Sequence, residues 1–410
     1  LVNAGSLGLG TVNAVGGGNV SLTSTVGNIT QTGPLTAGVL TLAAGGNVTL
    51  ANAGNAITSL GASTIGGSLN LVDTTGDLTV TGAVTSTAGG VTLNAQGGSL
   101  ITNAAGDITA GGAISLTGAT GITAAGDVTT TATGGADTIT FISNVPLSGP
   151  VVVTTAGAAG DDVTFQGTVN GARALTVAAG AGDVSFTQNV GASTALASIN
   201  VSGDQITLHD VTTTGTQTYT AVTSITTNSS YVSNGSVITF AGPLILGDDT
   251  FVDTTGASVT PTGAAINFNS TVNATTAGAG AESLTLNAGT GGVITAVGTV
   301  GNTDPMGTIT ITNTGDVTAQ LIARHWVIDD AQGHTEEVKG LGVVGNQPLL
   351  RPGESFQYTS GTRLRTPQGS MRGSYFCVAE DGERFEALVP EFALMADGGE
   401  GAQGAPRVLH

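Results

Sequence analysis

A short phrase recurs through the first three hundred residues and limits the fold more than any other feature of the chain. Most copies have Gly, a small polar residue, and then aliphatic residues alternating with Thr, Ser or Asn, as in G-N-V-T-L (Gly46 to Leu50) and G-S-L-N-L (Gly67 to Leu71). In G-V-T-L-N (Gly90 to Asn94) the aliphatic residue follows Gly directly. Alternation with period two, bounded by Gly, indicates short strands. Helix is disfavoured, because each interior Gly costs about 1 kcal/mol relative to Ala.

The strands recur at nearly regular intervals. The first apolar residues of one set lie 21, 22, 17 and 20 positions apart: Val48, Leu69, Val91, Ile108 and Val128. A second set lies between them: Ile57, Leu78, Leu100 and Ile114. Two or three strands per period predict a β-solenoid, in which equivalent apolar residues stack into continuous columns. Asn side chains at equivalent turns are expected to form hydrogen-bonded ladders along the stack.

Charge is distributed unevenly and divides the chain into two parts. Residues 1–306 contain one basic residue, Arg173, against 15 acidic ones, whereas residues 307–410 contain 8 basic and 13 acidic residues. We therefore predict a repeat domain over 1–306 and a second domain over 307–410, with a seam near Asp304 and Pro305. The repeats are regular over 1–136 and looser over 137–306.

Two longer phrases recur within the looser part. V-T-F-Q-G-T-V-N (Val163 to Asn170) returns as I-N-F-N-S-T-V-N (Ile266 to Asn273) at an offset of 103, and L-T-V-A-A-G-A-G (Leu175 to Gly182) returns at an offset of 109. The difference predicts a six-residue insertion around Ala274 to Gly280. These phrases resemble the repeats of exported bacterial proteins of the filamentous-haemagglutinin type. That resemblance implies a right-handed parallel β-helix that serves as a secreted, adhesin-like stalk.

The acidic balance also limits the partners of the repeats. Phosphate binding requires Lys or Arg, so a nucleic-acid partner is excluded for residues 1–306, and an anionic membrane surface is disfavoured. We find no apolar run long enough to span a bilayer. The first residue, Leu1, follows no basic segment or signal core, which indicates a fragment or a mature product. The single cysteine, Cys377, is expected to be a small buried hydrophobic residue rather than a reactive thiol.

Candidate chemistry in the repeats is sparse. β-Helical enzymes that act on polysaccharides use clustered carboxylates with a basic residue, and Arg173 alone does not supply that set. We therefore predict no enzymatic activity and no cofactor. The alternative is Ca²⁺ bound at acidic turns, since Ca²⁺ prefers oxygen ligands; its candidate ligands are Asp161, Asp162, Asp248 and Asp249. Solvated turn carboxylates are the preferred interpretation.

The C-terminal part contains a non-repeating string of motifs. They include R-H-W (Arg324 to Trp326), Q-P-L-L-R-P-G-E-S-F (Gln347 to Phe356) and T-P-Q-G-S-M-R-G-S-Y (Thr366 to Tyr375). From about Thr308 onward the chain resembles the ApaG family. The resemblance implies an antiparallel, immunoglobulin-like β-sandwich, in agreement with the short alternating strands and turns. ApaG domains normally begin with a longer N-terminal region, so this sandwich is expected either to borrow a strand from the last coil or to expose an edge.

G-L-G-V-V-G (Gly340 to Gly345) matches the dinucleotide-binding pattern, but β signals surround it and no helix follows. A structural turn is the preferred interpretation. A glycine loop can still bind an anion through its amides, and the resemblance to ApaG allows a phosphate or pyrophosphate ligand there. The candidate ligand-binding residues are Gly340, Gly342, Gly345, Arg324, Arg351 and Arg372. His325 is expected to be exposed beside a packed Trp326.

Together these observations lead to two functional hypotheses. The first is a non-enzymatic bacterial protein of two parts, in which an exported, cell-surface stalk carries an ApaG-like module that binds a protein or cell-surface ligand. The alternative is a cytoplasmic phosphate-binding, nucleotide-binding or protein-interaction domain, with the repeats as an accidental or artificial fusion. The two hypotheses place the chain in different compartments, because such stalks are exported and ApaG domains are normally intracellular.

Overall fold

The structure is a computed structural model that describes residues 1–275, 282–298, 300, 309–313, 316–343, 347–356, 365–366 and 368–395. All regular structure in these residues is β-strand. Contacts divide the chain into two compact units, Leu1–Val211 and Thr212–His410, which are described separately. The predicted domain boundary at 306/307 lies outside the described residues and stays a prediction.

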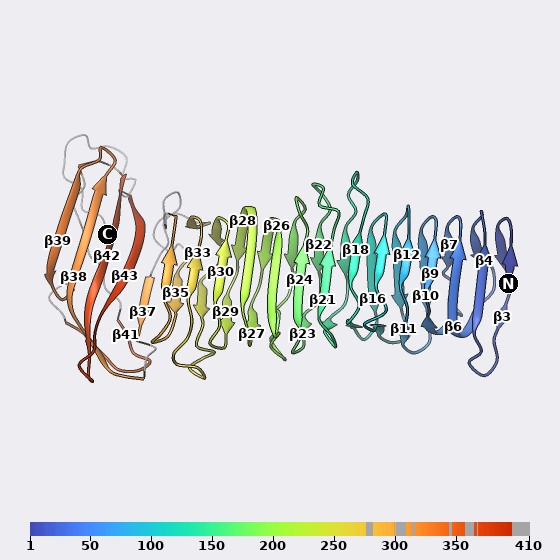
Figure 1. Cartoon of the computed structure of the whole chain (residues 1–410), viewed down its shortest axis with the longest axis horizontal. Coiled ribbons are helices and arrows are strands. Elements are labelled where there is room, and N and C mark those ends of the chain that lie inside the picture. The colour runs from blue at the N-terminus through green and yellow to red at the C-terminus, as the bar shows by residue number, and fades with distance from the viewer. Residues whose placement is uncertain are drawn as a thin grey trace. The chain divides into compact units, whose positions relative to one another are not determined.

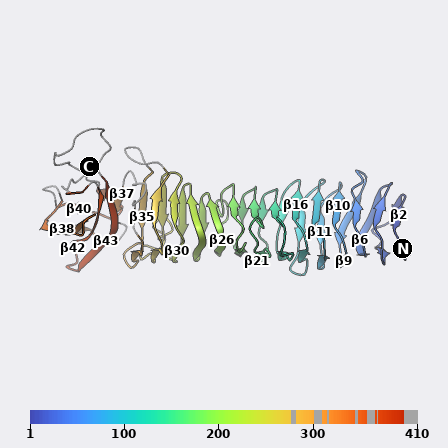
Figure 2. The same cartoon turned by 90° about the horizontal axis from the view of Figure 1, so that it is seen from above.

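The first unit is a β-solenoid in which each full coil contributes three strands (Figures 1 and 2). Equivalent strands of successive coils pair in parallel and build three rows. The first row contains β2 (Leu7–Leu9), β5 (Ile29–Gln31), β7 (Val48–Leu50), β10 (Leu69–Asp73), β13 (Val91–Ala95), β16 (Ile114–Gly118), β19 (Ile139–Phe141), β22 (Val163–Phe165), β25 (Val184–Phe186) and the end of β26 (Ser198–Leu208).

The second and third rows complete each coil. The second row contains β3 (Val12–Asn13), the start of β6 (Leu35–Ala44), β8 (Ala56–Leu60), β11 (Leu78–Val80), β14 (Leu100–Thr102), β17 (Ile122–Thr123), β20 (Val145–Pro146) and β23 (Val169–Asn170). The third row contains β1 (Val2–Asn3), β4 (Val20–Ser24), the end of β6, β9 (Ser63–Ile65), β12 (Val84–Ser86), β15 (Ile108–Ala110), β18 (Val128–Thr130), β21 (Val151–Thr154), β24 (Ala174–Ala178) and the start of β26.

The predicted apolar columns are present, but the assignment of residues to columns needs correction. Val48, Leu69 and Val91 lie directly above one another, as expected, and are almost completely buried. The next member of this column is Ile114, whereas Ile108 and Val128 belong to the third row with Val84. Likewise, Leu78 pairs with Leu100 as expected, but Ile122 follows Leu100 in place of Ile114.

Variable coil length is the reason for this error. Along the column of Val48, Leu69, Val91 and Ile114, each coil is one position longer than the coil before it. The extra positions lie in the corners between strands. Residues chosen at a constant spacing therefore pass from one row to another within a few coils. Row membership is fixed by which side chains point inward, because a shift of one residue would turn every apolar side chain outward.

Polar turn residues form ladders between coils, as predicted for Asn. The backbone amide of Asn47 donates to Asn28 Oδ1 (2.8 Å), and the amide of Ser68 donates to Asn47 Oδ1 (2.8 Å). Asp does the same further on, since the amide of Asp127 donates to Asp107 Oδ1 (2.9 Å). The ladder therefore runs from side chain to backbone and satisfies corner amides that have no partner within their own coil.

Aromatic residues enter the core where the repeat loosens. Phe141 pairs with Leu116 below it and with Phe165 above it, and Phe186 follows. The rings of Phe141 and Phe165 are stacked with centroids 4.5 Å apart, and those of Phe165 and Phe186 with centroids 4.8 Å apart. Larger side chains thus continue an aliphatic column without changing its register.

The second unit begins with further solenoid coils. Its strands are β28 (Gln217–Thr227), β29 (Ser230–Ser233), β30 (Ile238–Ala241), β31 (Leu244–Leu246), β32 (Thr250–Asp253), β33 (Ile266–Phe268), β34 (Val272–Ala274), β35 (Leu284–Asn287), β36 (Ile294–Ala296) and β37 (Ile309–Thr312); β27 (Val211–Thr213) lies at the boundary between the units. The predicted insertion falls between β34 and β35, and residues 276–281 lie outside the description.

An antiparallel sheet forms the C-terminal part of the second unit. Its order is β39-β38-β42-β43, with β40 also paired to β38. The strands are β38 (Ala319–Asp330), β39 (Thr335–Leu341), β40 (Leu349–Leu350), β42 (Gln368–Ala379) and β43 (Arg384–Met395); β41 (Ser355–Phe356) lies in the other layer. Trp326, Ile328, Val343, Met371 and Tyr375 form the core, against which Phe356 of β41 packs.

Of the two arrangements expected for the start of the sandwich, the structure has the borrowed one. Strand β37 pairs in parallel with β35 of the solenoid and antiparallel with β41. A second junction joins Val300, which pairs with Val272 of β34, to Phe392 of β43. The Val300 amide donates to the Glu391 carbonyl over 3.1 Å. The C-terminal sheet is therefore joined to the last coil at two of its three rows.

Candidate functional site

The glycine loop at the end of β39 lies beside Arg324 of the neighbouring strand. Gly340 is the pairing partner of Arg324, whose guanidinium donates to the carbonyls of Leu341 (3.2 Å) and Gly342 (2.6 Å). Gly342 has a φ of +59°, and its amide donates to the Ile322 carbonyl over 2.9 Å. In the described part of this loop, carbonyls therefore face the Arg324 guanidinium, and the Gly342 amide is already hydrogen-bonded to β38. Gly345 lies outside the described residues.

The other two predicted arginines lie apart from this loop and face carboxylates. Arg351 is 3.8 Å from Glu354, whose side chain also accepts the Arg351 amide. Arg372 of β42 binds Asp329 of β38 and lies 3.9 Å from Glu391 of β43. The pKa of Asp329 is lowered, first by the hydrogen bond from Thr335 and then by Arg372. The structure therefore brings Arg324 to the glycine loop and leaves Arg351 and Arg372 in separate ion pairs.

A cleft of about 450 Å³ lies between β36 of the solenoid and the C-terminal sheet. The wall from the sheet includes His325, Arg372, Leu388 and Pro390, and the wall from the solenoid is Val293 to Ala296. This cleft could not be predicted from the sequence, because its two walls lie far apart along the chain and only the join between solenoid and sheet brings them together. Val293 and Leu388, each more than half accessible, mark it as an apolar surface.

His325 and Trp326 take opposite sides of β38, as expected. Trp326 is buried with its ring edge-on to Tyr375, whereas the His325 side chain is 38% exposed. His325 Nε2 lies 3.2 Å from Glu337, which also pairs with Lys339 at 2.9 Å. The pKa of Glu337 is lowered, first by Lys339 and then by His325. This exposed polar group spans β38 and the edge strand β39.

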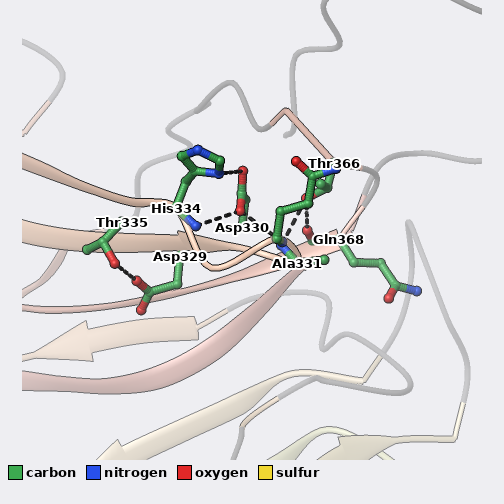
Figure 3. Close-up of polar contacts among 8 residues, drawn as sticks. Asp329, Asp330, Ala331, His334, Thr335, Thr366 and Gln368 are labelled. Atoms are coloured by element: carbon green, nitrogen blue, oxygen red, sulfur yellow. Dashed lines mark hydrogen bonds and ion pairs between the residues drawn. The ribbon is translucent and has the colours of Figure 1, made fainter.

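The turn between β38 and β39 is organised by Asp330 (Figure 3). Its Oδ1 accepts the backbone amides of Gln332 (2.9 Å) and His334 (2.8 Å), and its Oδ2 lies 3.5 Å from His334 Nδ1. These contacts lower the pKa of Asp330, with the His334 amide as the largest cause. Thr366 receives the Ala331 amide over 3.0 Å and so connects the turn to the residues before β42.

We expect Asp330→Asn to lower the stability of the second unit at neutral pH, because Asn retains an acceptor oxygen but loses the charge. A carboxyl group with a folded pKa below its unfolded value of about 3.9 contributes stability above that value and loses it as the pH falls through the folded pKa. The difference between wild type and variant should therefore close below about pH 4. Urea titrations at pH 7, 5 and 3 measure it; a gap that is constant with pH would contradict the assignment.

Cys377 behaves as the sequence predicts for a packing residue. Its side chain is partly buried against the core of the sheet, and burial raises the pKa of its thiol to about 11. The thiolate is the nucleophilic form of cysteine. At neutral pH the Cys377 thiol is therefore protonated and weakly reactive.

The acidic turns proposed as Ca²⁺ ligands bind backbone amides. Asp161 is fully buried and accepts the amides of Asp137 (3.0 Å) and Ala158 (2.8 Å). Asp162 accepts the Asp183 amide, and Asp249 accepts the amide and hydroxyl of Ser283, each over 2.8 Å. The Ser283 amide is the main reason that the pKa of Asp249 is lowered. Asp248 Oδ1 accepts the amide of Asp249 over 2.7 Å. Asp161, Asp162 and Asp249 therefore belong to the ladders between coils, whereas Asp248 binds within its own turn.

Two features are absent from the described residues. They contain no group of three His, Cys, Asp or Glu side chains placed to hold a metal ion. Nor do they include a helix with the length and hydropathy needed to cross a bilayer.

Comparison with known proteins separates the two parts of the chain. A family model for repeats of unknown function matches residues 1–60, and the model of the ApaG domain matches residues 307–379. Protein ApaG of Acidovorax sp. (strain JS42) is 71% identical over 105 residues, which are 25% of this chain and 77% of that protein. Protein ApaG of Ralstonia nicotianae is 63% identical over 103 residues, covering 25% and 76% of the two chains.

A solved structure is also similar in sequence. The ApaA protein from Bordetella pertussis is 56% identical to this chain over 22% of it and 73% of that chain, with a TM-score of 0.21. Residues 307–379, which the ApaG-domain model matches, contain β38 and β42, the two central strands of the antiparallel sheet. They also contain the motifs on which the sequence resemblance rests. Through its C-terminal quarter, this chain belongs to the ApaG family.

Proposed function

We propose that the chain is a non-enzymatic bacterial binding protein, in which an exported β-solenoid stalk carries an ApaG-like binding module. The observation that carries the proposal is the position of β37 between β35 and β41. An accidental fusion would leave two self-contained folds joined by a linker. Here the first strand of the ApaG-like part extends a solenoid row on one side and pairs with its own module on the other, which supports a single functional unit.

The proposed role of the repeats as a stalk is supported by their packing. Columns of fully buried side chains run from coil to coil, and corner amides are bonded to the next coil. The one basic side chain of the repeats is used structurally, since Arg173 Nε donates to the Ser148 carbonyl over 3.0 Å. Such a stack suits a rigid support better than a catalytic surface. The exported, adhesin-type role rests on the resemblance of the repeats to filamentous-haemagglutinin-type sequences.

The binding role of the module is supported by the cleft beside β36. Its walls combine exposed apolar side chains, such as Val293 and Leu388, with the charged pair of Arg372 and Glu391. Exposed apolar patches rimmed by polar groups mark sites of interaction with other proteins and ligands. A protein or cell-surface ligand therefore fits this module better than a phosphate at the glycine loop, where the Gly342 amide and the Arg324 guanidinium are already bonded.

Surface labelling of the bacterium that encodes the chain tests the proposed location. An antibody against residues 1–306 should label intact cells, and protease added outside the cells should remove the signal. Labelling that appears only after lysis would overturn the exported role and favour the cytoplasmic alternative. A periplasmic marker and a cytoplasmic marker, probed in the same samples, control for leakage.

A titration with pyrophosphate tests the alternative ligand. In the full chain with ¹⁵N-labelled glycine, the amide signals of Gly340 and Gly342 should not shift, because the Gly342 amide is bonded to Ile322 and Arg324 covers the loop carbonyls. A saturable shift that disappears in Arg324→Gln would instead support a phosphate-binding module.

A further inference from the structure

The last described coil of the solenoid ends differently in its three rows. In the second row, β37 follows β35 and is itself paired with β41. In the first row, Val300 follows β34 and is paired with Phe392. In the third row, β36 follows β33 and forms one wall of the cleft, with β38, β42 and β43 supplying the opposite wall. Every row of this coil thus meets a part of the ApaG-like module.

The end coil of a solenoid can pair with strands of other chains and so promote aggregation. An unpaired edge strand presents a row of amides and carbonyls to which any other strand can add. Repeat proteins therefore need terminal elements that differ from the internal repeats.

A second copy of this chain offers a partner edge. Any C-terminal row that was open could pair with the same row of that copy, because an unpaired edge strand accepts another strand.

In the third row, the last described strand is less buried than the strand before it. Ile266 and Phe268 of β33 are 0% and 2% exposed, whereas their partners on β36, Ile294 and Ala296, are only half-buried. A further coil would complete this burial. The side chains of Arg372, Leu388 and Pro390 stand across the cleft from β36 and occupy the direction from which that coil would arrive.

We propose that the ApaG-like module caps the solenoid, by pairing with two rows and overhanging the third, and so keeps a second copy of this chain from adding there. The proposal is independent of what the module binds. It assigns to β37 and to Phe392 a role that an isolated ApaG-like sandwich would not need, which is to complete the hydrogen bonds of the solenoid rows.

Proline substitution in β41 tests the cap. The Asn313 amide donates to the Glu354 carbonyl over 3.0 Å, so these two residues form a hydrogen-bonded pair. Hydrogen-bonded and non-hydrogen-bonded pairs alternate along antiparallel strands, which makes Phe356 and Ile311 the next hydrogen-bonded pair. The Phe356 amide is therefore assigned to the Ile311 carbonyl. Phe356→Pro removes this donor, whereas the control Phe356→Ala keeps it and removes the same ring. In sedimentation at about 0.15 M salt, where surface charges are screened beyond about 8 Å, we expect Phe356→Pro to assemble with rising concentration and Phe356→Ala to stay monomeric.

A disulfide provides a second test in case Phe356→Pro loses its β-structure. Thr312 and Ser355 form the non-hydrogen-bonded pair next to Ile311 and Phe356. The Cα atoms of such a pair lie about 4.5 Å apart, a distance at which a disulfide can form. Thr312→Cys with Ser355→Cys, in a Cys377→Ser background, locks β41 onto β37. At the urea concentration where Trp326 fluorescence first changes, the reduced form should assemble about tenfold more than the oxidised form. Equal assembly of both forms would overturn the proposal. So would a Phe356→Pro variant that stays monomeric although rapid exchange of its Asn313 amide shows that β41 has separated from β37.

Discussion

Replacement of Phe165 by Ala is expected to destabilise the first unit by about 3–5 kcal/mol, the usual range for loss of a buried aromatic ring. Phe165 is 1% exposed and lies between the rings of Phe141 and Phe186, both of which would lose a stacking partner. The cavity cannot collapse easily, because strands on either side are held in parallel register by backbone hydrogen bonds. The loss is measured as the change in urea midpoint by circular dichroism.

The control for this experiment is Val152→Ala, which removes an outward-facing side chain that is 40% exposed in the same unit. Its expected cost is within about 0.5 kcal/mol. Repeat proteins unfold nearly one coil at a time when their interfaces are weak, so amide exchange around β22 accompanies the titration. Equal effects of the two substitutions would show that the aromatic stack is dispensable to the solenoid.

Gly373→Ala is expected to destabilise the C-terminal sheet by about 3 kcal/mol, at the upper end of the range for overpacking. Gly373 pairs with Trp326 across β42 and β38, next to a register shift after Met371. A Cβ atom at this position would lie 2.1 Å from the His325 carbonyl oxygen and 2.5 Å from the Trp326 ring. Backbone and a packed indole must therefore both move.

The matched control is Gly340→Ala in the neighbouring strand β39. A Cβ atom there meets only the end of the Arg324 side chain, at 3.3 Å, and that side chain can rotate away. We expect a change of less than about 1 kcal/mol. Trp326 is the one tryptophan of the chain, so its fluorescence reports the unfolding of this sheet in both variants. A similar loss in both would contradict the assigned clash.

The fold was largely predictable because it follows from local patterns. Alternating apolar residues bounded by Gly identified strands, and Val48, Leu69 and Val91 were correctly aligned. The alignment failed for Ile108, Val128 and Ile114, because corner length varies and the sequence does not show which apolar strand begins each row. The opposite orientations of His325 and Trp326 followed from the alternation of a single strand.

The site was less predictable, because its geometry depends on distant segments. Arg372 and Asp329 lie on paired strands that are separated along the chain by β39, β40 and β41, and the cleft joins residues near 294 to residues near 390. The glycine motif illustrates a different limit. Sequence identifies residues able to turn the chain, but strand pairing decides whether amides or carbonyls face outward, and around Gly342 the carbonyls face Arg324.

The variable length of the coils has an evolutionary consequence. The coil that separates Val48 from Leu69 is shorter than the coil that separates Ile114 from Ile139, yet the register of the column is unbroken. Corner segments can therefore gain or lose residues while the stacked strands stay in place. Such corners can change in length and sequence without a cost to the scaffold, so related solenoids should diverge at their corners long before they diverge in how they are built.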